Sequence, residues 1–171
     1  MKIVMNEKGE IVARHADADD IKPRHYSEFG PVLIGVIDDR QWSQDSKGRD
    51  LIEGSVIDVA RDLAGQMVRA AVSAMLADLS RDYPQEERDT WPTKIVEAQA
   101  ILAGGSVEDT IYIAAVAAAT GKPPEEIAAK VIEKATEYAT EVARAEAYRT
   151  TRYGTIDKAK NVKSVVAAVE G

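Results

Sequence analysis

Few side chains in this sequence have a type and spacing that could carry out acid–base or metal chemistry. The two histidines, His15 and His25, lie in the N-terminal third, and aspartates at 17, 19 and 20 follow His15. A histidine near carboxylates can act as a general base or bind a metal ion. The aspartates lack the turn glycine and distal glutamate of a calcium loop, however, and no cysteine or Gly-x-Ser-x-Gly elbow accompanies the histidines. We therefore predict that both histidines are solvated loop residues.

Two other patterns could bind or transfer a charged group. The Gly-Gly-Ser run at 104–106 precedes a predicted helix, whose first backbone N–H groups could bind an anion. Glu108 and Asp109 already place negative charge at that helix start, and the sequence contains neither the P-loop nor the dinucleotide-binding pattern. Glu86 and Glu87 are adjacent, so they cannot face one substrate from the same side of a helix. The sequence therefore predicts no catalytic residue, no cofactor and no metal site.

The composition indicates an acidic, soluble protein. Over 171 residues the formal net charge is −7, and 30% of the residues are charged. Such a chain is a poor partner for nucleic acid, whose phosphates require a basic face. The sequence has no long apolar run and no signal-peptide plan, which predicts no membrane partner and synthesis in the cytoplasm. The absence of cysteine excludes disulfides and thiolate catalysis.

The elements that must position these residues are a β-rich start and a helical remainder. Apolar runs at 2–5 and 11–13 flank a turn that contains Gly9, which predicts a β-hairpin over residues 2–14. Residues 30–37 are the best single strand and could complete a three-stranded sheet. Residues 41–48 are expected to be a linker or an exposed turn. The predicted fold class is α+β, with a small antiparallel β module at 1–50 and a mainly helical, oligomeric domain at 51–171.

From Ser55 the apolar period changes from two residues to about 3.6, which predicts a helix of about 25 residues. Its apolar stripe covers most of the circumference, so the helix needs cover on more than one side, from a bundle or from an oligomer. The stripe consists of Val56, Val59, Ala60, Leu63, Met67, Ala70, Ala71, Ala74 and Met75, widened by Val68, Val72, Leu76 and Leu79.

The segment 83–92 joins this helix to an alanine-rich helical region. Tyr83-Pro84 and Trp91-Pro92 predict two bends about two helical turns apart, because proline fits the first turn of a helix but not its interior. A tryptophan at such a bend usually packs between helices. We expect a structural elbow at 83–92 in which Trp91 is the wedge and Tyr83 lies next to it.

Further helices are predicted at 93–103, at 107–120 with Ser106 as N-cap, and at 124–152, with glycines ending the first two. Tyr153-Gly154 is expected to break the longest of them before a short amphipathic helix at 156–169. The helix at 124–152 carries a heptad-like seam that could pair within the chain or drive self-association. The seam is formed by Ala128, Val131, Ala135, Tyr138, Val142 and Ala145.

The run from Asp82 to Ala98 contains a Tyr-Pro turn, a charged stretch, Thr-Trp-Pro and the start of a Glu-Ala-rich helix. This run resembles a segment of small bacteriophage tail proteins, the tail-fibre proteins and tail-fibre assembly chaperones. The proline-bounded alanine helix at 111–126, the helix from Ala128 and the arginine-rich turn at 149–152 are similar to features that follow in that family. The likeness spans roughly residues 56–169 and does not include the first 50 residues.

The resemblance implies a non-enzymatic protein that assists the assembly or attachment of tail fibres, as a chaperone or an adaptor. The implied partner is a tail-fibre or baseplate protein, and the implied location is the host cytoplasm during assembly or the virion tail. A permanent virion component at the junction of tail or baseplate and fibre, or an unrelated helical oligomerisation module, fits the same features. The residues expected to contact a partner are Leu63, Met67, Val72, Leu79, Tyr83, Trp91, Val131, Tyr138 and Val142.

Overall fold

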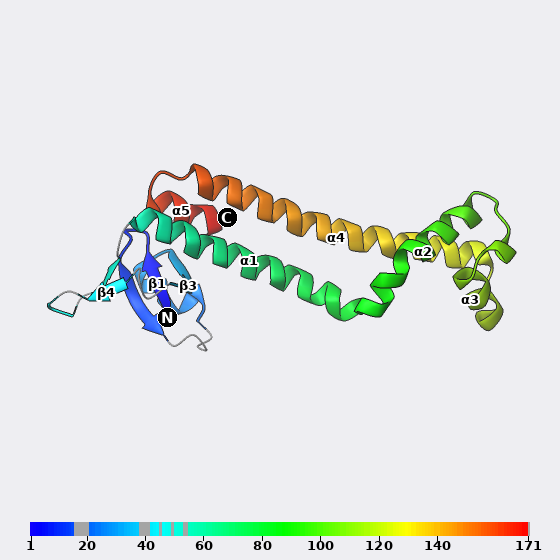
Figure 1. The fold of residues 1–171 in the computed structure, drawn as a ribbon, viewed down its shortest axis with the longest axis horizontal. Helices are drawn as coiled ribbons and strands as arrows, with labels where there is room; N and C mark the ends of the chain where they lie inside the picture. Colours follow the sequence, from blue (N-terminus) through cyan, green and yellow to red (C-terminus); the bar gives the residue numbers. More distant parts are fainter. Residues whose placement is uncertain (16–20, 38–41, 45, 49, 53–54, 171) are drawn as a thin grey trace. The chain divides into compact units, whose positions relative to one another are not determined.

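The computed structural model of this chain describes residues 1–15, 21–37, 42–44, 46–48, 50–52 and 55–170. Within these residues the fold is α+β, as the sequence predicts, with short antiparallel strands followed by five α-helices (Figure 1). The strands are β1 (Lys2–Asn6), β2 (Ile11–His15), β3 (Val32–Val36), β4 (Trp42–Gln44) and β5 (Asp50–Ile52), and the 3-10 segments are η1 (Pro23–Phe29) and η3 (Val107–Asp109). The α-helices are α1 (Val56–Asp82), α2 (Gln85–Leu102), α3 (Tyr112–Thr120), α4 (Pro124–Lys158) and α5 (Val162–Glu170).

The chain forms two compact units. The first, called the sheet unit, comprises Met1–Ser73 and Glu146–Gly171, and the second, called the helical unit, comprises Ala74–Ala145. The sheet unit contains the described strands, α5, the first part of α1 and the last part of α4. The predicted β module at 1–50 is therefore part of a larger unit, which also contains the first part of α1, the last part of α4 and α5.

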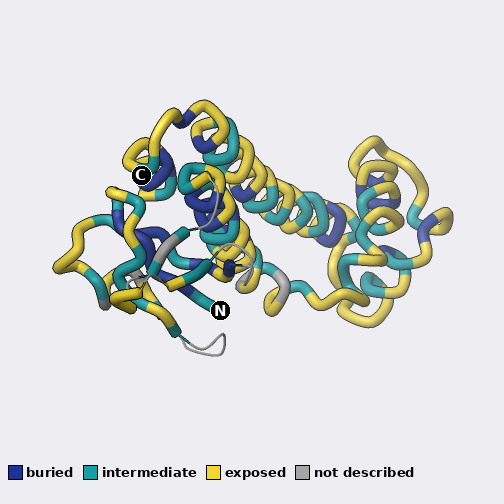
Figure 2. Tube along the Cα trace, turned by 60° about the vertical axis from the view of Figure 1, so that its left-hand side comes forward, coloured by how far each residue is buried: buried dark blue, intermediate teal, exposed yellow. Residues whose placement is uncertain are grey.

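The three-stranded sheet has the order β2-β1-β3, with both neighbours antiparallel to β1. The predicted hairpin and third strand are confirmed. Gly9 takes a φ of 84°, a left-handed conformation that glycine adopts without strain, and the Asn6 Oδ1 accepts hydrogen bonds from the backbone N–H groups of Lys8 and Glu10. The central strand β1 is the most deeply buried of the three (Figure 2).

A second, two-stranded ribbon pairs β4 with β5. The prediction of a linker or exposed turn at 41–48 is wrong for residues 42–44, which form a strand. The ribbon is held by side chains: the Trp42 Nε1–H donates to the Asp50 carboxylate at 3.2 Å, and Arg14 of β2 forms an ion pair with Asp50 at 3.1 Å. The Arg14 guanidinium also lies 5.2 Å from the Trp42 ring centroid. The Arg14–Asp50 pair joins two segments that are distant in sequence, a contact that no local sequence pattern indicates.

The core of the sheet unit contains the first part of the predicted α1 stripe, together with β1 and β3. Ile3, Met5 and Leu33 from the sheet and Leu63 from α1 are all fully buried. Gly35 permits this close approach, since a Cβ at that position would lie 2.8 Å from the Leu63 Cδ2. Burial of apolar area at about 25 cal/mol per Å² is the main force that holds α1 against the sheet.

The end of α4 differs from the prediction. A break at Tyr153-Gly154 was expected, but the helix continues to Lys158, and α5 starts at Val162 instead of near 156. One glycine costs a helix only about 1 kcal/mol. The actual stop precedes Asn161, whose Oδ1 accepts a hydrogen bond from the Ser164 backbone N–H at 2.8 Å and so caps α5.

The bend at Tyr83-Pro84 is present, and the predicted bend at Trp91-Pro92 is not. α1 ends at Asp82, and α2 begins at Gln85 and runs through Pro92 to Leu102. A proline inside a helix removes one backbone hydrogen bond and costs about 3 kcal/mol. The Thr90 hydroxyl donates to the Glu87 carbonyl oxygen at 2.7 Å in this turn. The packing of Trp91 on two tyrosines, described below, offsets part of this cost.

Candidate functional site

The helical unit has its own small apolar core between α2, α3 and α4. Its buried members are Ala98, Ile101, Ile113, Ile127 and Ala128. The alanines allow the helices to approach closely. Partly buried side chains pack against this core: Val107, Tyr112, Val116, Ala117, Val131 and Ile132. Those partly buried neighbours include residues of the pocket described next.

The start of α3 is held by a buried carboxylate from α2. Glu97, only 8% exposed, accepts hydrogen bonds from the backbone N–H groups of Ile111 at 3.0 Å, Tyr112 at 2.8 Å and Ile113 at 3.1 Å. A carboxylate at this point satisfies N–H groups that have no partner within the helix and lies at the positive end of the helix dipole. Glu97 therefore fixes the position of α3 against α2.

This arrangement corrects the predicted helix at 107–120. Ser106 is an N-cap, as expected, with its Oγ accepting from the Glu108 N–H at 3.2 Å, but it starts only the 3-10 turn η3. The α-helix begins anew at Tyr112 because Glu97 binds the N–H groups there. Gly121 ends α3, in agreement with the prediction.

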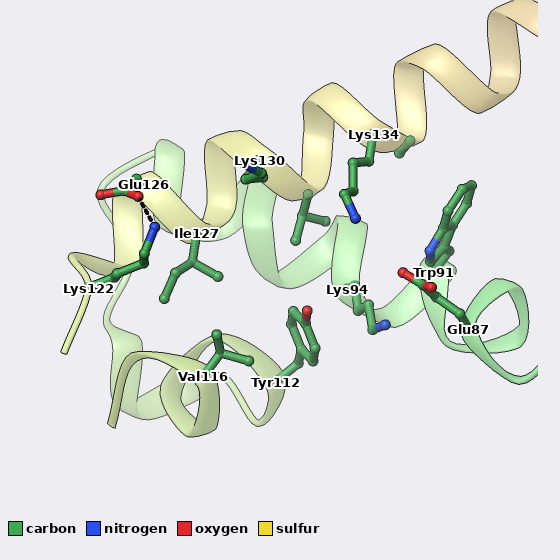
Figure 3. A pocket seen from close by; sticks show the side chains of 12 residues that line it. Glu87, Trp91, Lys94, Tyr112, Val116, Lys122, Glu126, Ile127, Lys130 and Lys134 are labelled. Carbon is green, nitrogen blue, oxygen red and sulfur yellow. Dashed lines mark hydrogen bonds and ion pairs between the residues drawn. The ribbon is translucent and has the colours of Figure 1, made fainter. Parts of the chain in front are cut away.

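A pocket of about 220 Å³ lies in the helical unit and is lined by α2, α3 and α4 (Figure 3). Its apolar wall combines two aromatic rings with aliphatic side chains. In Figure 3 the side chains of Tyr112 and Val116 rise from α3 toward α4, and Ile127 points from α4 toward α3. The apolar lining residues are Trp91, Tyr112, Val116, Ile127, Val131 and Ala135.

Charged groups complete the lining, with four lysines against two glutamates. The lysines are Lys94, Lys122, Lys130 and Lys134, and the glutamates are Glu87 and Glu126. The Lys122 Nζ lies 2.6 Å from the Glu126 Oε1, and this hydrogen bond, with the nearby positive charge, lowers the pKa of the Glu126 carboxyl below its usual value of 4.5. The Lys94 Nζ lies 4.6 Å from the Tyr112 ring centroid, a cation–π contact.

The aromatic wedge expected at the elbow is present within the helical unit. Trp91 packs edge-to-face on Tyr83, with centroids 5.0 Å apart, and on Tyr138 of α4 at 4.7 Å. Tyr83 and Tyr138 also meet, at 5.8 Å. The Lys134 Nζ lies 5.9 Å from the Tyr83 ring centroid. Trp91 thus belongs to both the aromatic cluster and the pocket wall.

The residues predicted to contact a partner divide between the two units. Tyr83, Trp91, Val131 and Tyr138 meet around the aromatic cluster and the pocket. Leu79 and Val142 are half-buried residues elsewhere in the helical unit. Leu63, Met67 and Val72 lie in the sheet unit, and Leu63 and Val72 are buried, at 0% and 8% exposure. The prediction that Leu63 and Val72 face a partner is therefore wrong, because they serve as core residues.

The heptad-like seam of α4 is partly buried within the single chain. Ala128 and Ala145 are buried, and the seam residues between them, Val131, Ala135, Tyr138 and Val142, are half-buried. Of the two alternatives, pairing within the chain accounts for this burial. Self-association of the protein stays a prediction.

Sequence reasoning missed Glu97 and the pocket lysines. The lysines carried a usable signal: positions 122, 126, 130 and 134 are all charged and spaced by four, which places them along one face of α4 and its entry turn. Glu97 carried no such signal, because its partners lie 14 to 16 residues further along the chain.

The histidine environment also differs from the prediction. His15 is half-buried at the end of β2, and its Nε2 is hydrogen-bonded to the Tyr26 hydroxyl, so it is no solvated loop residue. His25 lies in η1 with its side chain outside the described part, and the aspartates at 17, 19 and 20 are also outside the described residues. Across the described ranges, no group of three or more His, Cys, Asp or Glu side chains could hold a metal ion.

No helix among the described residues is both long enough and apolar enough to span a membrane. Comparison of the chain with protein-family models, with curated proteins and with solved structures found no match.

Proposed function

We propose that this chain is a non-enzymatic bacteriophage tail-module protein that assists the assembly or attachment of tail fibres, as a chaperone or an adaptor. One observation supports the proposal most: the run that resembles tail-fibre proteins, residues 82–98, contributes much of the candidate site. Tyr83 belongs to the aromatic cluster, Glu87, Trp91 and Lys94 line the pocket, and Glu97 caps α3.

The helical unit has the features of a surface that binds another protein. Aromatic side chains and lysine stems surround a concave site, and aromatic anchors commonly carry most of the free energy of a protein–protein contact. Among the described residues of the same unit four large apolar side chains are exposed, Met75 at 43%, Val96 at 65%, Leu102 at 51% and Ile111 at 83%. A fibre chain with apolar segments not yet buried in its trimer would be a suitable partner for such a surface.

Co-expression with the neighbouring fibre gene tests the proposal. We expect fibre trimers, measured by size-exclusion chromatography, to form in higher yield with the chain than without it. Lys130→Glu, at the pocket, should reduce the yield, while Lys160→Glu in the sheet unit makes the same charge change and should not. If trimers form equally well without the chain, and purified virions also lack it, the proposal is wrong.

Mass spectrometry of purified virions separates the chaperone from a permanent component of the junction between tail or baseplate and fibre. A chaperone is present in the host cytoplasm during assembly and absent from the particle. Retention in the particle at a fixed ratio to the fibre indicates the structural role. Sedimentation of the isolated chain tests the predicted homo-oligomer.

A further inference from the structure

We propose that the pocket of the helical unit binds an acidic peptide segment, taking one large apolar side chain into the pocket while the lysines around it bind the flanking carboxylates. The inference rests on the proposed function in one respect, since the peptide would belong to the partner protein. The chemistry of the site follows from the residues of the pocket alone.

The size of the pocket favours a single anchor side chain. Sites for drug-sized ligands and cofactors usually occupy about 300–1,000 Å³. The volume here, about 220 Å³, is smaller. The wall formed by Trp91, Tyr112, Val116 and Ile127 is aromatic and aliphatic, so an aromatic or long aliphatic side chain would replace water there at a gain in free energy. An anchor of this kind in a pre-formed pocket is a common mode of peptide recognition.

The charge around the pocket opposes the charge of the whole protein. The chain carries a formal net charge of −7, yet its pocket has four lysines and two glutamates. Lys122 is paired with Glu126, but Lys94, Lys130 and Lys134 form no ion pair with any residue that the structure describes. Aromatic rings lie beneath two of these amines, Tyr112 beneath Lys94 and Tyr83 beneath Lys134.

Cation–π contacts leave these ammonium groups positive and able to donate hydrogen bonds. A carboxylate that approaches the pocket therefore meets the Lys94 and Lys134 amines, which form no ion pair with a described residue, and the Lys130 amine, whose charge also acts on the Glu126 carboxylate. Charge complementarity of this kind selects an acidic partner and disfavours a basic one. The local excess of lysine in an acidic chain is the observation that identifies the peptide as acidic.

Titration of the isotope-labelled whole chain with a short peptide tests the proposal by NMR. The probe has a central phenylalanine with two glutamates on each side and blocked ends. Trp91 lines the pocket, whereas Trp42 lies in the sheet unit, and these are the two tryptophans of the chain. We expect the Trp91 indole signal to shift with peptide concentration and the Trp42 signal to stay in place as an internal control.

Two matched changes measure the contribution of charge. Replacing the four glutamates of the peptide with glutamine should weaken binding at least about tenfold, as should the double variant Lys94→Gln/Lys130→Gln. The control Lys158→Gln/Lys160→Gln removes the same charge from the sheet unit and should leave the Kd unchanged. A peptide with alanine in place of phenylalanine should also bind more weakly.

Several results would overturn the proposal. These are equal binding of the glutamine peptide, an unchanged Kd in the pocket double variant, or no shift of the Trp91 signal up to millimolar peptide. Self-association that the pocket substitutions abolish would assign the site to a second copy of the chain instead. If peptide binds as expected but fibre trimers form independently of the chain, the proposed function fails and the binding site stands. If fibre trimers depend on the chain but the peptide does not bind, the proposed binding site is refuted and the proposed function stands.

Discussion

Replacing Glu97 with alanine should lower the free energy of local unfolding of α3 by about 2–4 kcal/mol. The carboxylate accepts three backbone hydrogen bonds, from Ile111, Tyr112 and Ile113. Ile111 is 83% exposed, so water can replace its bond, but Ile113 is fully buried and its N–H would lose its partner at a cost of about 1–3 kcal/mol. Loss of the negative charge at the positive end of the helix adds about 0.3–1 kcal/mol. Loss of the third hydrogen bond, from the Tyr112 N–H, accounts for the rest of the expected change in free energy.

Hydrogen exchange followed by mass spectrometry is the suitable assay. α3 has nine residues, a length at which an isolated helix is marginal in water, so it can open without unfolding of the whole chain. A change of 2–4 kcal/mol corresponds to a loss of protection of about 30- to 700-fold for the amides of this helix. Amides of the three-stranded sheet should keep their protection, because they belong to the other compact unit.

Two further variants test the reasoning. Glu97→Gln keeps one acceptor oxygen but loses the charge, so its effect should be intermediate. Glu133→Ala removes a glutamate from an exposed position of α4 and should change protection by less than the equivalent of about 0.5 kcal/mol. Unchanged exchange of the α3 amides in Glu97→Ala, or an equal effect of Glu133→Ala, would refute the assignment of Glu97 as the residue that holds α3.

Four other substitutions have expected outcomes. Trp91→Ala should lower the free energy of unfolding by about 2–3 kcal/mol, measured with urea, because it removes two edge-to-face contacts and a half-buried ring; a change below 1 kcal/mol, the order of a single pair, would contradict the wedge. Gly154→Ala should raise stability by about 0.5–1 kcal/mol, seen as a higher Tm, because the helical site has open space for a Cβ. Gly35→Ala should instead lower it by about 1–3 kcal/mol, since the added Cβ would meet α1 side chains at 2.8 Å; equal Tm shifts for the two glycines would refute both arguments. The Glu126 carboxylate pairs with Lys122, so its pKa is depressed in the folded state; its contribution is present above pH 4.5 and is lost as the pH falls through the folded pKa. Lys122→Ala should raise the Glu126 pKa toward its usual value in an NMR titration, and an unchanged pKa would contradict the pairing.

Elements with a regular apolar period could be predicted from the sequence. The hairpin and β3 followed from runs of β-branched residues around a turn glycine, and α1 followed from a stripe with a period near 3.6. Such patterns are local, and each element buries the face that its own sequence makes apolar. Leu63 and Val72 show the limit of this argument: the stripe identified them as apolar contacts, but only the fold showed that the contacts lie within the chain.

Helix boundaries that depend on tertiary contacts could not be predicted. Pro92 lies inside α2 and Gly154 inside α4. In a helix interior a proline costs about 3 kcal/mol and a glycine about 1 kcal/mol. At Pro92 the neighbouring Trp91 packs against two tyrosines. Intrinsic helix propensity predicts a helix boundary poorly where contacts with distant residues stabilise the helix by a comparable free energy.

The position of Trp91 determines which experiments can separate folding from binding. Trp91 packs on Tyr83 and Tyr138 and also lines the pocket, so its removal would weaken both the elbow and the candidate site. A loss of partner binding in Trp91→Ala would therefore not identify the pocket as the binding surface. Lys130 is exposed, and substitutions there change the charge of the pocket and leave the aromatic cluster in place. A loss of binding in a lysine variant with an unchanged Tm is the result that assigns recognition to the pocket.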